Sequence, residues 1–378
     1  MNESKLFTVI IAHFNQLNLL QNAVNSVLCQ KYPRIELVIA DDCTEGFNEV
    51  NVRAEIKTAG TGVENIVISR NTSNLGTVAS LNNAIMKSSG EYLLMFAADD
   101  ALEDSTVLSK FAQGLDADRG AAAMFARCME YDINLENIIS DYYYPRDKSK
   151  ELGKLCAKEQ NERLSMGCLI SIGATAFRRC ELEAKPFNER YKYIEDWPLF
   201  LMLTRQGKAL RYLDFVALRH RAGGVSRQGD TLSAAGRICN IEFVNILERE
   251  VLPYIKDMCL ETQTNIITRY EQALADTLSR IGAFEHLSYF KLFFMYPKLM
   301  LKRAIWKYVP LFVSYSKNIV VITVILLAAI LFSKIVFGDK AQLISQVLFY
   351  TALIIDAFAA ICIAIDTHLK NKTGAKNK

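Results

Sequence analysis

Tyr92-Leu-Leu-Met-Phe-Ala-Ala-Asp-Asp100 is an apolar run that ends on two adjacent carboxylates. Tyr92–Ala97 has the length and composition of a buried strand, and Gly90 is typical of a preceding helix stop. Carboxylates at a strand end suit a hard divalent cation such as Mg²⁺ or Mn²⁺. Such a pair is also common at solvated loop ends, and Asp104 or Ser105 could cap the next helix.

Strand-like and helix-like segments alternate on the N-terminal side of this run. This alternation predicts an α/β fold with a mostly parallel central sheet flanked by helices on both faces. Ligands of such sheets bind beyond the carboxyl ends of the strands, where both acidic pairs, Asp41-Asp42 and Asp99-Asp100, are expected. The predicted strands are 6–12, 35–40 and 66–69, and the predicted helices are 19–28 and 79–87.

The middle of the chain, roughly residues 106–228, has a more irregular pattern. It predicts a helix after Lys158 and a short apolar strand-like run over 173–177. From about residue 230 to residue 279 the apolar positions recur at helical spacing, which predicts a helical segment.

Two long apolar stretches lie near the C-terminus. Residues 318–337 and 343–365 contain 20 and 23 residues, and each is long enough to cross a bilayer core of roughly 30 Å. Only five residues separate them, which predicts a transmembrane helical hairpin. Basic residues lie outside both ends, so both flanks are expected at the cytoplasmic face. The alternative is a buried helical pair in a soluble core.

The segment before the hairpin, residues 286–310, mixes five basic residues with aromatic ones and has no acid. This mixture is typical of an interfacial helix on an anionic membrane surface, although an amphipathic helix packed on the rest of the protein would show it too. A net charge of only +3 argues against a nucleic-acid binder. Nine scattered cysteines and a polar N-terminus without a secretory signal predict a reducing, cytosolic face.

Four blocks of sequence together resemble the family-2 glycosyltransferases, which have the GT-A fold. They follow that family's order and spacing over about residues 6–228, and the joint pattern is more specific than any single block. The blocks are Thr8-Val-Ile-Ile-Ala-His-Phe-Asn15; Glu36-Leu-Val-Ile-Ala-Asp-Asp42; Asn74-Leu-Gly76 with Asn82 and Gly90-Glu-Tyr92 leading into Phe96-Ala-Ala-Asp-Asp100; and Glu195-Asp196-Trp197 followed by Gly207 and 221–226.

The resemblance implies a nucleotide-sugar site at the ends of the first strands. The residues after the first strand would line the nucleotide pocket, and the acidic pair after the second would hydrogen-bond the base or the ribose. The Asn-Leu-Gly turn and the following helix would shape the loop beneath the donor, and an arginine would contact its phosphates. Taken alone, the asparagine, glycine and aspartate positions are also typical turn formers. The implied donor-binding residues are Ala12, His13, Asn15, Asp41, Asp42, Asn74, Gly76, Asn82, Asp99 and Arg221.

The resemblance also implies a Mn²⁺ or Mg²⁺ ion that bridges the diphosphate, with Asp99, Asp100 and His220 as its protein ligands. Ala97 stands where the family's Asp-x-Asp signature has its first aspartate, which predicts weaker ribose contact or metal affinity. A lone histidine before an arginine is also typical of a surface residue. Residues 220–226 have the pattern of a flexible, glycine-containing segment that closes over phosphates.

Glu195 and Asp196 match the segment that supplies the family's catalytic base. Asp196 is the implied base, which takes the proton of the acceptor hydroxyl, and Glu195 would contact the acceptor or orient the loop. Asp196 could also be a helix N-cap, because a helical pattern with Pro198 in its first turn follows it. Trp197 could stack on a sugar ring, but a buried core position is the preferred interpretation.

These features predict a metal-dependent, inverting glycosyltransferase at the cytoplasmic face of a plasma or inner membrane. Its expected donor is a nucleotide-diphospho-sugar, preferably a UDP-sugar, and its expected acceptor is a saccharide or a lipid-linked molecule. The hairpin could also support a homo-oligomer. The alternative is a non-catalytic, membrane-anchored scaffold that binds nucleotide-sugar; a transporter is disfavoured. The predicted parts are 1–105 (nucleotide-sugar-binding half), 106–228 (acceptor-binding half), 229–310 (helical segment), 311–370 (hairpin) and 371–378 (basic tail).

Overall fold

The computed structural model describes residues 4–56, 61–141, 145–223 and 234–281. These residues belong to one unit, Met1–Phe284, and a second unit spans Glu285–Lys378. The predicted interfacial segment, transmembrane hairpin and basic tail therefore lie outside the described residues. Among the helices of the described ranges, none combines the length and the apolar character needed to cross a bilayer.

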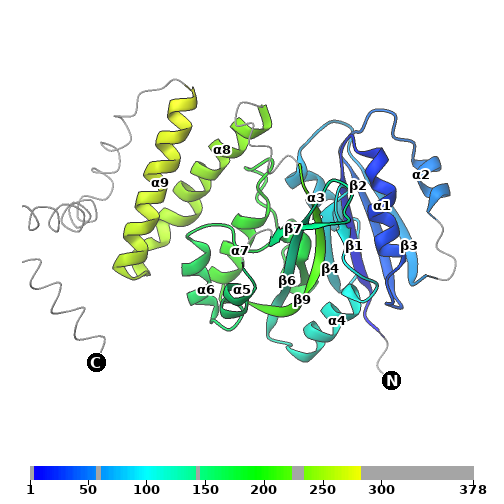
Figure 1. The fold of residues 1–378 in the computed structure, drawn as a ribbon, viewed down its shortest axis with the longest axis horizontal. Coiled ribbons are helices and arrows are strands. Elements are labelled where there is room, and N and C mark those ends of the chain that lie inside the picture. Colours follow the sequence, from blue (N-terminus) through cyan, green and yellow to red (C-terminus); the bar gives the residue numbers. More distant parts are fainter. Residues whose placement is uncertain (1–3, 57–60, 142–144, 224–233, 282–378) are drawn as a thin grey trace, which may run out of the picture. The chain divides into compact units, whose positions relative to one another are not determined.

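The N-terminal part of the central sheet is parallel, as predicted. Its strands are β1 (Phe7–His13), β2 (Ile35–Asp41), β3 (Val63–Arg70) and β4 (Tyr92–Ala97). β1 lies between β2 and β4, and Ala12 pairs with Ala40 on one side and with Ala97 on the other. The carboxyl ends of three strands therefore lie level at one edge of the sheet (Figure 1).

Helices cover both faces of this parallel part. α1 (Leu17–Leu28) and α4 (Val107–Ala117) pack into the same apolar cluster as Phe7, Val9 and Ile11, which share one face of β1. α3 (Thr77–Met86) contacts β1 and β2, and its buried residues lie outside that cluster. The short helix α2 (Glu49–Glu55) was not predicted.

Beyond β4 the sheet becomes mixed. Among the described residues it has nine strands, in the order β3-β2-β1-β4-β8-β6-β9-β5, with β7 paired to β6. β8 is antiparallel to both neighbours, whereas β6 and β9 run parallel to each other. The added strands are β5 (Ala101–Leu102), β6 (Ala121–Tyr131), β7 (Ile138–Asp141), β8 (Thr175–Arg178) and β9 (Ala209–Arg221).

The prediction of an irregular middle segment is wrong for β6 and β9. β6 is buried at nearly every position and begins with three alanines, so it shows no alternation of polar and apolar residues. β9 ends on His220 and Arg221, which were predicted to lie in a flexible segment. The strand-like run predicted over 173–177 is confirmed as β8, which begins at Thr175.

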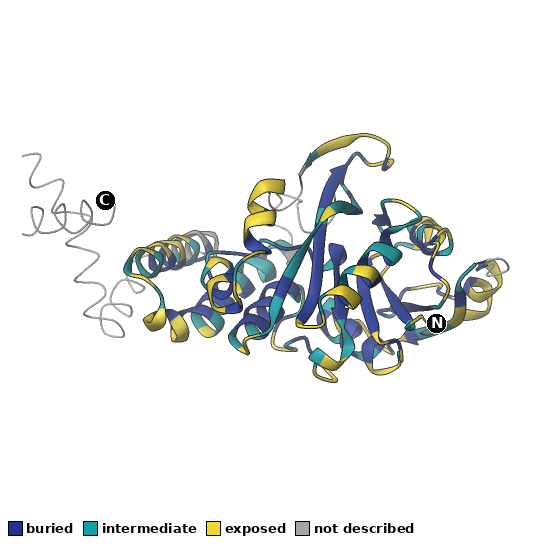
Figure 2. Ribbon diagram, turned by 90° about the horizontal axis from the view of Figure 1, so that it is seen from below, coloured by how far each residue is buried: buried dark blue, intermediate teal, exposed yellow. Residues whose placement is uncertain are grey.

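The helical segment predicted from about residue 230 is confirmed from Ala234 onward, with an interruption. α8 (Ala234–Ile246) continues into a π turn (Leu247–Val251) and a 3₁₀ turn (Leu252–Asp257) before α9 (Leu260–Ile281). Figure 2 shows buried residues along the strands and exposed residues on the outer sides of the helices. The remaining helices are α5 (Arg146–Leu152), α6 (Ala157–Leu164) and α7 (Asp196–Arg205).

Candidate active site

Asp99 and Asp100 lie in the turn between β4 and β5. After this turn the chain leaves β4 and pairs with β9, since Ala101 lies opposite Arg219. The turn therefore connects the carboxyl edge of the parallel strands to the end of β9. Asp99 is half-buried, and its Oδ2 accepts a long hydrogen bond of 3.4 Å from Nε2 of Gln16. Asp100 is buried.

The carboxylate of Asp100 is held by the last two residues of β9. Nδ1 of His220 lies 3.0 Å from Oδ1 and 3.2 Å from Oδ2 of Asp100, and the backbone N–H of Arg221 donates to Oδ1 at 3.1 Å. The Arg221 guanidinium continues this bracing: Nε donates to the carbonyl of Asp99 at 2.8 Å, and another nitrogen donates to the carbonyl of Ile133. The predicted phosphate contact is thus the arginine that fixes the acidic turn.

Burial and pairing shift the proton affinities of this pair. Burial raises the pKa of Asp100 above its usual value, and the hydrogen bond from His220 only partly offsets that effect. Burial alone lowers the pKa of His220, but the hydrogen bond to Asp100 and the nearby acidic charges outweigh it and leave the pKa raised. His220 is buried, so its interpretation as a surface residue is wrong.

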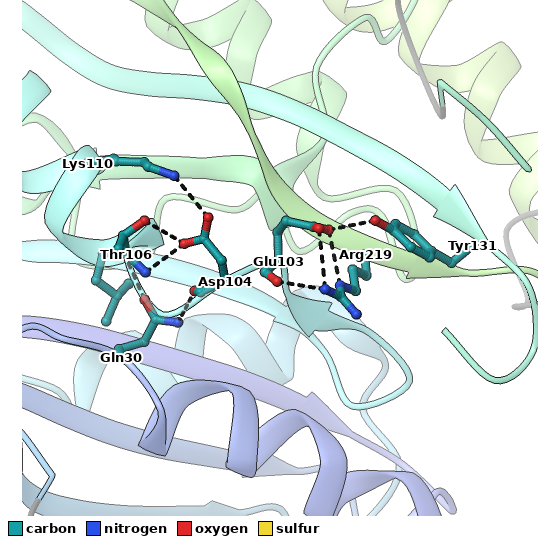
Figure 3. Close-up of polar contacts among 8 residues, drawn as sticks. Gln30, Glu103, Asp104, Thr106, Lys110, Tyr131 and Arg219 are labelled. Atoms are coloured by element: carbon teal, nitrogen blue, oxygen red, sulfur yellow. Dashed lines mark hydrogen bonds and ion pairs between the residues drawn. The ribbon is translucent and has the colours of Figure 1, made fainter. Parts of the chain in front are cut away.

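A second network fixes the segment that follows the acidic turn (Figure 3). The guanidinium of Arg219 donates to Glu103 at 3.1 and 3.3 Å, and the Tyr131 hydroxyl donates to the same carboxylate at 2.9 Å. Asp104 does not cap α4 directly: the helix has Thr106 at its N-cap position, and Oδ1 of Asp104 accepts from the N–H and the hydroxyl of Thr106. The sequence offered no motif for the contacts of Glu103, because Arg219 and Tyr131 are far from it along the chain.

His13 and Asp41 end neighbouring strands and contact each other. Nδ1 of His13 lies 3.0 Å from Oδ1 of Asp41 and 3.2 Å from Oγ1 of Thr44. Burial alone raises the pKa of Asp41, but the hydrogen bonds from His13 and Thr44 outweigh it and leave the pKa below its usual value. Arg70 adds an ion pair to Asp41 at 3.2 Å. Nε2 of His13 is buried, with no hydrogen-bond partner among the described residues.

The other predicted pocket residues lie near these two. Ala12 is half-buried at the end of β1, and Asn15 is exposed. Asn15 has a positive φ of 54°, and its backbone N–H donates to Oγ1 of Thr44 at 2.9 Å. Thr44, which the sequence reasoning missed, therefore joins the residues after β1 to those after β2.

Asp42 organises the loop before α3. Its carboxylate accepts hydrogen bonds from the N–H groups of Leu75 and Gly76, each at 2.8 Å, and from Nδ2 of Asn71 at 3.0 Å. Gly76 has a φ of +89°, and a Cβ at this position would lie 2.4 Å from Cγ of Lys192. Asn74 is exposed on the same loop. Asp42 therefore has a structural role in a loop distant in sequence, and Gly76 has the backbone conformation that favours glycine.

α3 and its preceding loop are tied to the segment before Glu195. The side chain of Asn82 donates to the carbonyl of Phe187 at 2.9 Å and accepts from the N–H of Phe187 at 3.1 Å. The N–H of Val78 donates to the carbonyl of Lys192 at 3.4 Å. α3, which follows the loop predicted to lie beneath the donor, therefore contacts the segment 187–192 that leads to the predicted base.

Glu195 and Asp196 form a pair of adjacent carboxylates at the start of α7. Asp196 is the first residue of the helix and Glu195 holds the N-cap position without a side-chain cap bond, so the prediction of Asp196 as the N-cap is wrong by one residue. Burial and the neighbouring charges of Asp196 and Glu242 raise the pKa of Glu195 to about 8. Because the two adjacent carboxyl groups interact, they titrate as a pair, and the raised pKa means that the pair holds a proton at neutral pH.

Trp197 is a core residue, as the preferred interpretation had it. It is 1% exposed, and its indole N–H donates to the carbonyl of Leu164 at 2.7 Å. The burial leaves no face open for stacking on a sugar. The Cys168 thiol interacts with Asp196, and burial together with this carboxylate raises the pKa of the thiol.

The acidic turn suits a hard divalent cation that also binds phosphate oxygens. Within the residues that the structure describes, no group of three or more His, Cys, Asp or Glu side chains forms a complete metal cage. Mg²⁺ and Mn²⁺ sites on nucleotides need only one or two protein carboxylates, because phosphates and water complete the shell. Asp99 fits this role: among the described residues its carboxylate has only the long contact to Gln16, whereas Asp100 is held by His220 and Arg221.

Comparisons with known proteins agree with this geometry. Residues 8–183 match the family described as Glycosyl transferase family 2. Mannosyltransferase PcManGT from Pyrobaculum calidifontis, solved with GDP-Man and Mn²⁺, is 18% identical with a TM-score of 0.51, over 74% of this chain and 75% of that chain. S. aureus TarS 1-349, solved with UDP-GlcNAc, is 17% identical with a TM-score of 0.48, over 76% and 75%. No curated protein sequence matches significantly.

The matched residues contain the parallel strands, both acidic pairs and β8, and they end before Glu195. The PcManGT structure shares the fold of the described domain. The chain is therefore a glycosyltransferase whose residues 8–183 match the model of Glycosyl transferase family 2, and its described domain has a GT-A-like fold.

Proposed function

We propose that the protein is a metal-dependent, inverting glycosyltransferase that transfers a sugar from a nucleotide-diphospho-sugar to a saccharide or lipid-linked acceptor at the cytoplasmic face of a membrane. A UDP-sugar is the expected donor. PcManGT was solved with GDP-Man, and a panel of UDP- and GDP-sugars tests which base the donor carries.

The observation that carries the proposal is the contact between the loop at the carboxyl edge of the sheet, where Asp99 also lies, and the segment that leads to Glu195 and Asp196. Asp99 follows β4 at the edge where β1, β2 and β4 end level. Glu195 and Asp196 begin α7, and the segment before them contacts the loop that Asp42 holds. A donor bound along the strand ends would thus have a cation at Asp99 beside its diphosphate, and the proton acceptor Asp196 near its sugar.

In the proposed reaction, Asp196 takes the proton of the acceptor hydroxyl as that oxygen attacks the anomeric carbon. The new carbon–oxygen bond forms while the bond from the anomeric carbon to the phosphate oxygen breaks, and the nucleoside diphosphate leaves with the bonding electrons. A divalent cation held at Asp99 would neutralise charge on the diphosphate. The raised pKa of Glu195 favours a state in which the adjacent carboxyls hold one proton between them, which leaves one carboxylate to act as the base.

Support for the membrane location comes from the sequence alone. The apolar stretches 318–337 and 343–365, with basic residues outside both, are the basis for anchoring. Anchoring would raise the concentration of the enzyme near a lipid-linked acceptor.

The competing function is a scaffold that binds nucleotide-sugar without turnover. Ala97 favours it, because this exposed residue at the end of β4 stands where the family has an aspartate. The discriminating experiment measures transfer and donor hydrolysis with a panel of nucleotide-sugars and Mn²⁺, for wild type, Asp99→Ala and Asp196→Ala. Loss of activity in both variants is expected. Activity that survives both changes would refute the site, and an inactive wild type that still binds donor would favour the scaffold.

A further inference from the structure

A buried glutamate outside the family-matched residues holds the chain just before the predicted base. The carboxylate of Glu242, on α8, accepts hydrogen bonds from three consecutive backbone N–H groups. Oε2 accepts from Tyr193 and Ile194, each at 3.1 Å, and Oε1 accepts from Lys192. Glu242 is 6% exposed. A buried carboxylate is stable only where such donors replace water, so these contacts are obligatory for this side chain.

The three N–H groups belong to the segment that ends at Glu195 and Asp196. Because successive amides point at one carboxylate, the backbone from Lys192 to Ile194 is restricted to a single arrangement. The carbonyl of Lys192 faces the other way and accepts from Val78. Glu242 therefore fixes a stretch of chain that contacts α3 and leads directly to the predicted base.

Other side chains of α8 and of the π turn that follows it also contact the segment 188–197. Phe243, next to Glu242, packs against Trp197 with the ring centroids 5.1 Å apart. At the start of the segment, Glu250 accepts from Asn188 at 3.1 Å and forms an ion pair with Arg205 at 2.9 Å. Glu242 lies in α8 and Glu250 in the π turn that follows it, so consecutive elements hold the two ends of this segment.

We propose that Glu242 is a positioning residue for glycosyl transfer: from a helix beyond the nucleotide-binding core, its carboxylate sets the position of the Asp196 base relative to the bound donor. The inference rests on the proposed role of Asp196. It assigns a function to α8, which follows the family-matched residues.

The first test is kinetic and uses the full-length protein. A displacement of about 1 Å at a reacting group can cost roughly 100-fold in rate. Glu242→Ala should therefore lower kcat by about 100-fold, while the Kd for the donor with Mn²⁺ rises by a much smaller factor, because among the described residues Glu242 forms no hydrogen bond with the parts of the chain that carry His13, Asp41 and Asp99. Glu242→Gln keeps an oxygen acceptor and should recover part of kcat. Glu261→Ala, at an exposed position in α9, is the matched control and should keep wild-type kcat.

The second test does not depend on activity. Hydrogen exchange of the backbone amides of residues 192–194 should accelerate in Glu242→Ala, with β1 and β4 as protected in the variant as in wild type. Unchanged exchange, or unchanged kcat with accelerated exchange, would overturn the inference. An inactive wild type with the expected exchange pattern would instead count against the proposed function. If Glu242→Ala does not fold, Glu242→Gln with wild-type kcat and wild-type exchange would overturn the inference.

Discussion

Nδ1 of His220 lies 3.0 Å from Oδ1 of Asp100, which joins two strand ends that are 120 residues apart in the chain. This contact, together with the N–H of Arg221 on the same carboxylate, holds the turn that presents Asp99. Asp100 therefore supports the turn, and Asp99 has the carboxylate that is available to a cation.

Replacing His220 by alanine should destabilise the folded protein. Asp100 would remain buried with one hydrogen-bond partner fewer, and such a loss costs about 1–3 kcal/mol. The measurement is the thermal unfolding of the full-length protein, with Glu261→Ala as an exposed control. A variant with the stability of the control would show that the Asp100–His220 contact contributes nothing to the fold.

Asp99→Asn should weaken the Mn²⁺ dependence of donor binding. The neutral amide keeps the size of the side chain and removes its charge, so the affinity for the donor should become similar with and without Mn²⁺. Binding of a labelled nucleotide-sugar over a Mn²⁺ titration measures this effect. An unchanged Mn²⁺ response in this variant would place the cation elsewhere.

Gly76→Ala should destabilise the loop before α3 and weaken donor binding. The position has a φ of +89° and its Cβ would lie 2.4 Å from Cγ and 2.9 Å from the carbonyl oxygen of Lys192. Strained backbone of this kind costs about 1–3 kcal/mol. Gly46→Ala is the matched control, since Gly46 has a φ of +74° and no atom within 4 Å of its Cβ position. If the two variants lose the same amount of unfolding free energy and of donor affinity, the contact between position 76 and Lys192 contributes to neither.

Glu195→Gln should gain stability relative to wild type as the pH rises. Burial and the charge of Asp196 raise the pKa of Glu195 from 4.5 to about 8 in the folded protein. Between these two values the folded state binds the extra proton, so wild type loses stability with increasing pH, by up to about 1.4 kcal/mol per pH unit. The glutamine variant lacks this loss.

Thermal unfolding of both proteins from pH 5 to pH 9 measures the difference, which should grow up to about pH 8 and then level off. Glu183→Gln, at an exposed position, is the control and should follow the wild-type curve. Parallel curves for Glu195→Gln and wild type would contradict the raised pKa.

The sequence predicted the parallel half of the sheet well, because its strands are continuous apolar runs that end on polar residues. Tyr92–Ala97 has the predicted bounds, and the helix expected over 19–28 is observed as Leu17–Leu28. β6 and β9 were missed because burial on both faces and scattered charges hide any alternation. Long-range partners were also missed: Glu103, Thr44 and Glu242 act through residues that only the fold brings near them.

The most direct test of the account is a single-turnover measurement on Asp196→Asn with donor, acceptor and Mn²⁺. If Asp196 is the base, the transfer rate should fall by about 10²–10⁴-fold, while the Kd for the donor stays within about threefold of wild type. A transfer rate close to that of wild type would show that another group takes the proton, and the assignment of Asp196 would be wrong.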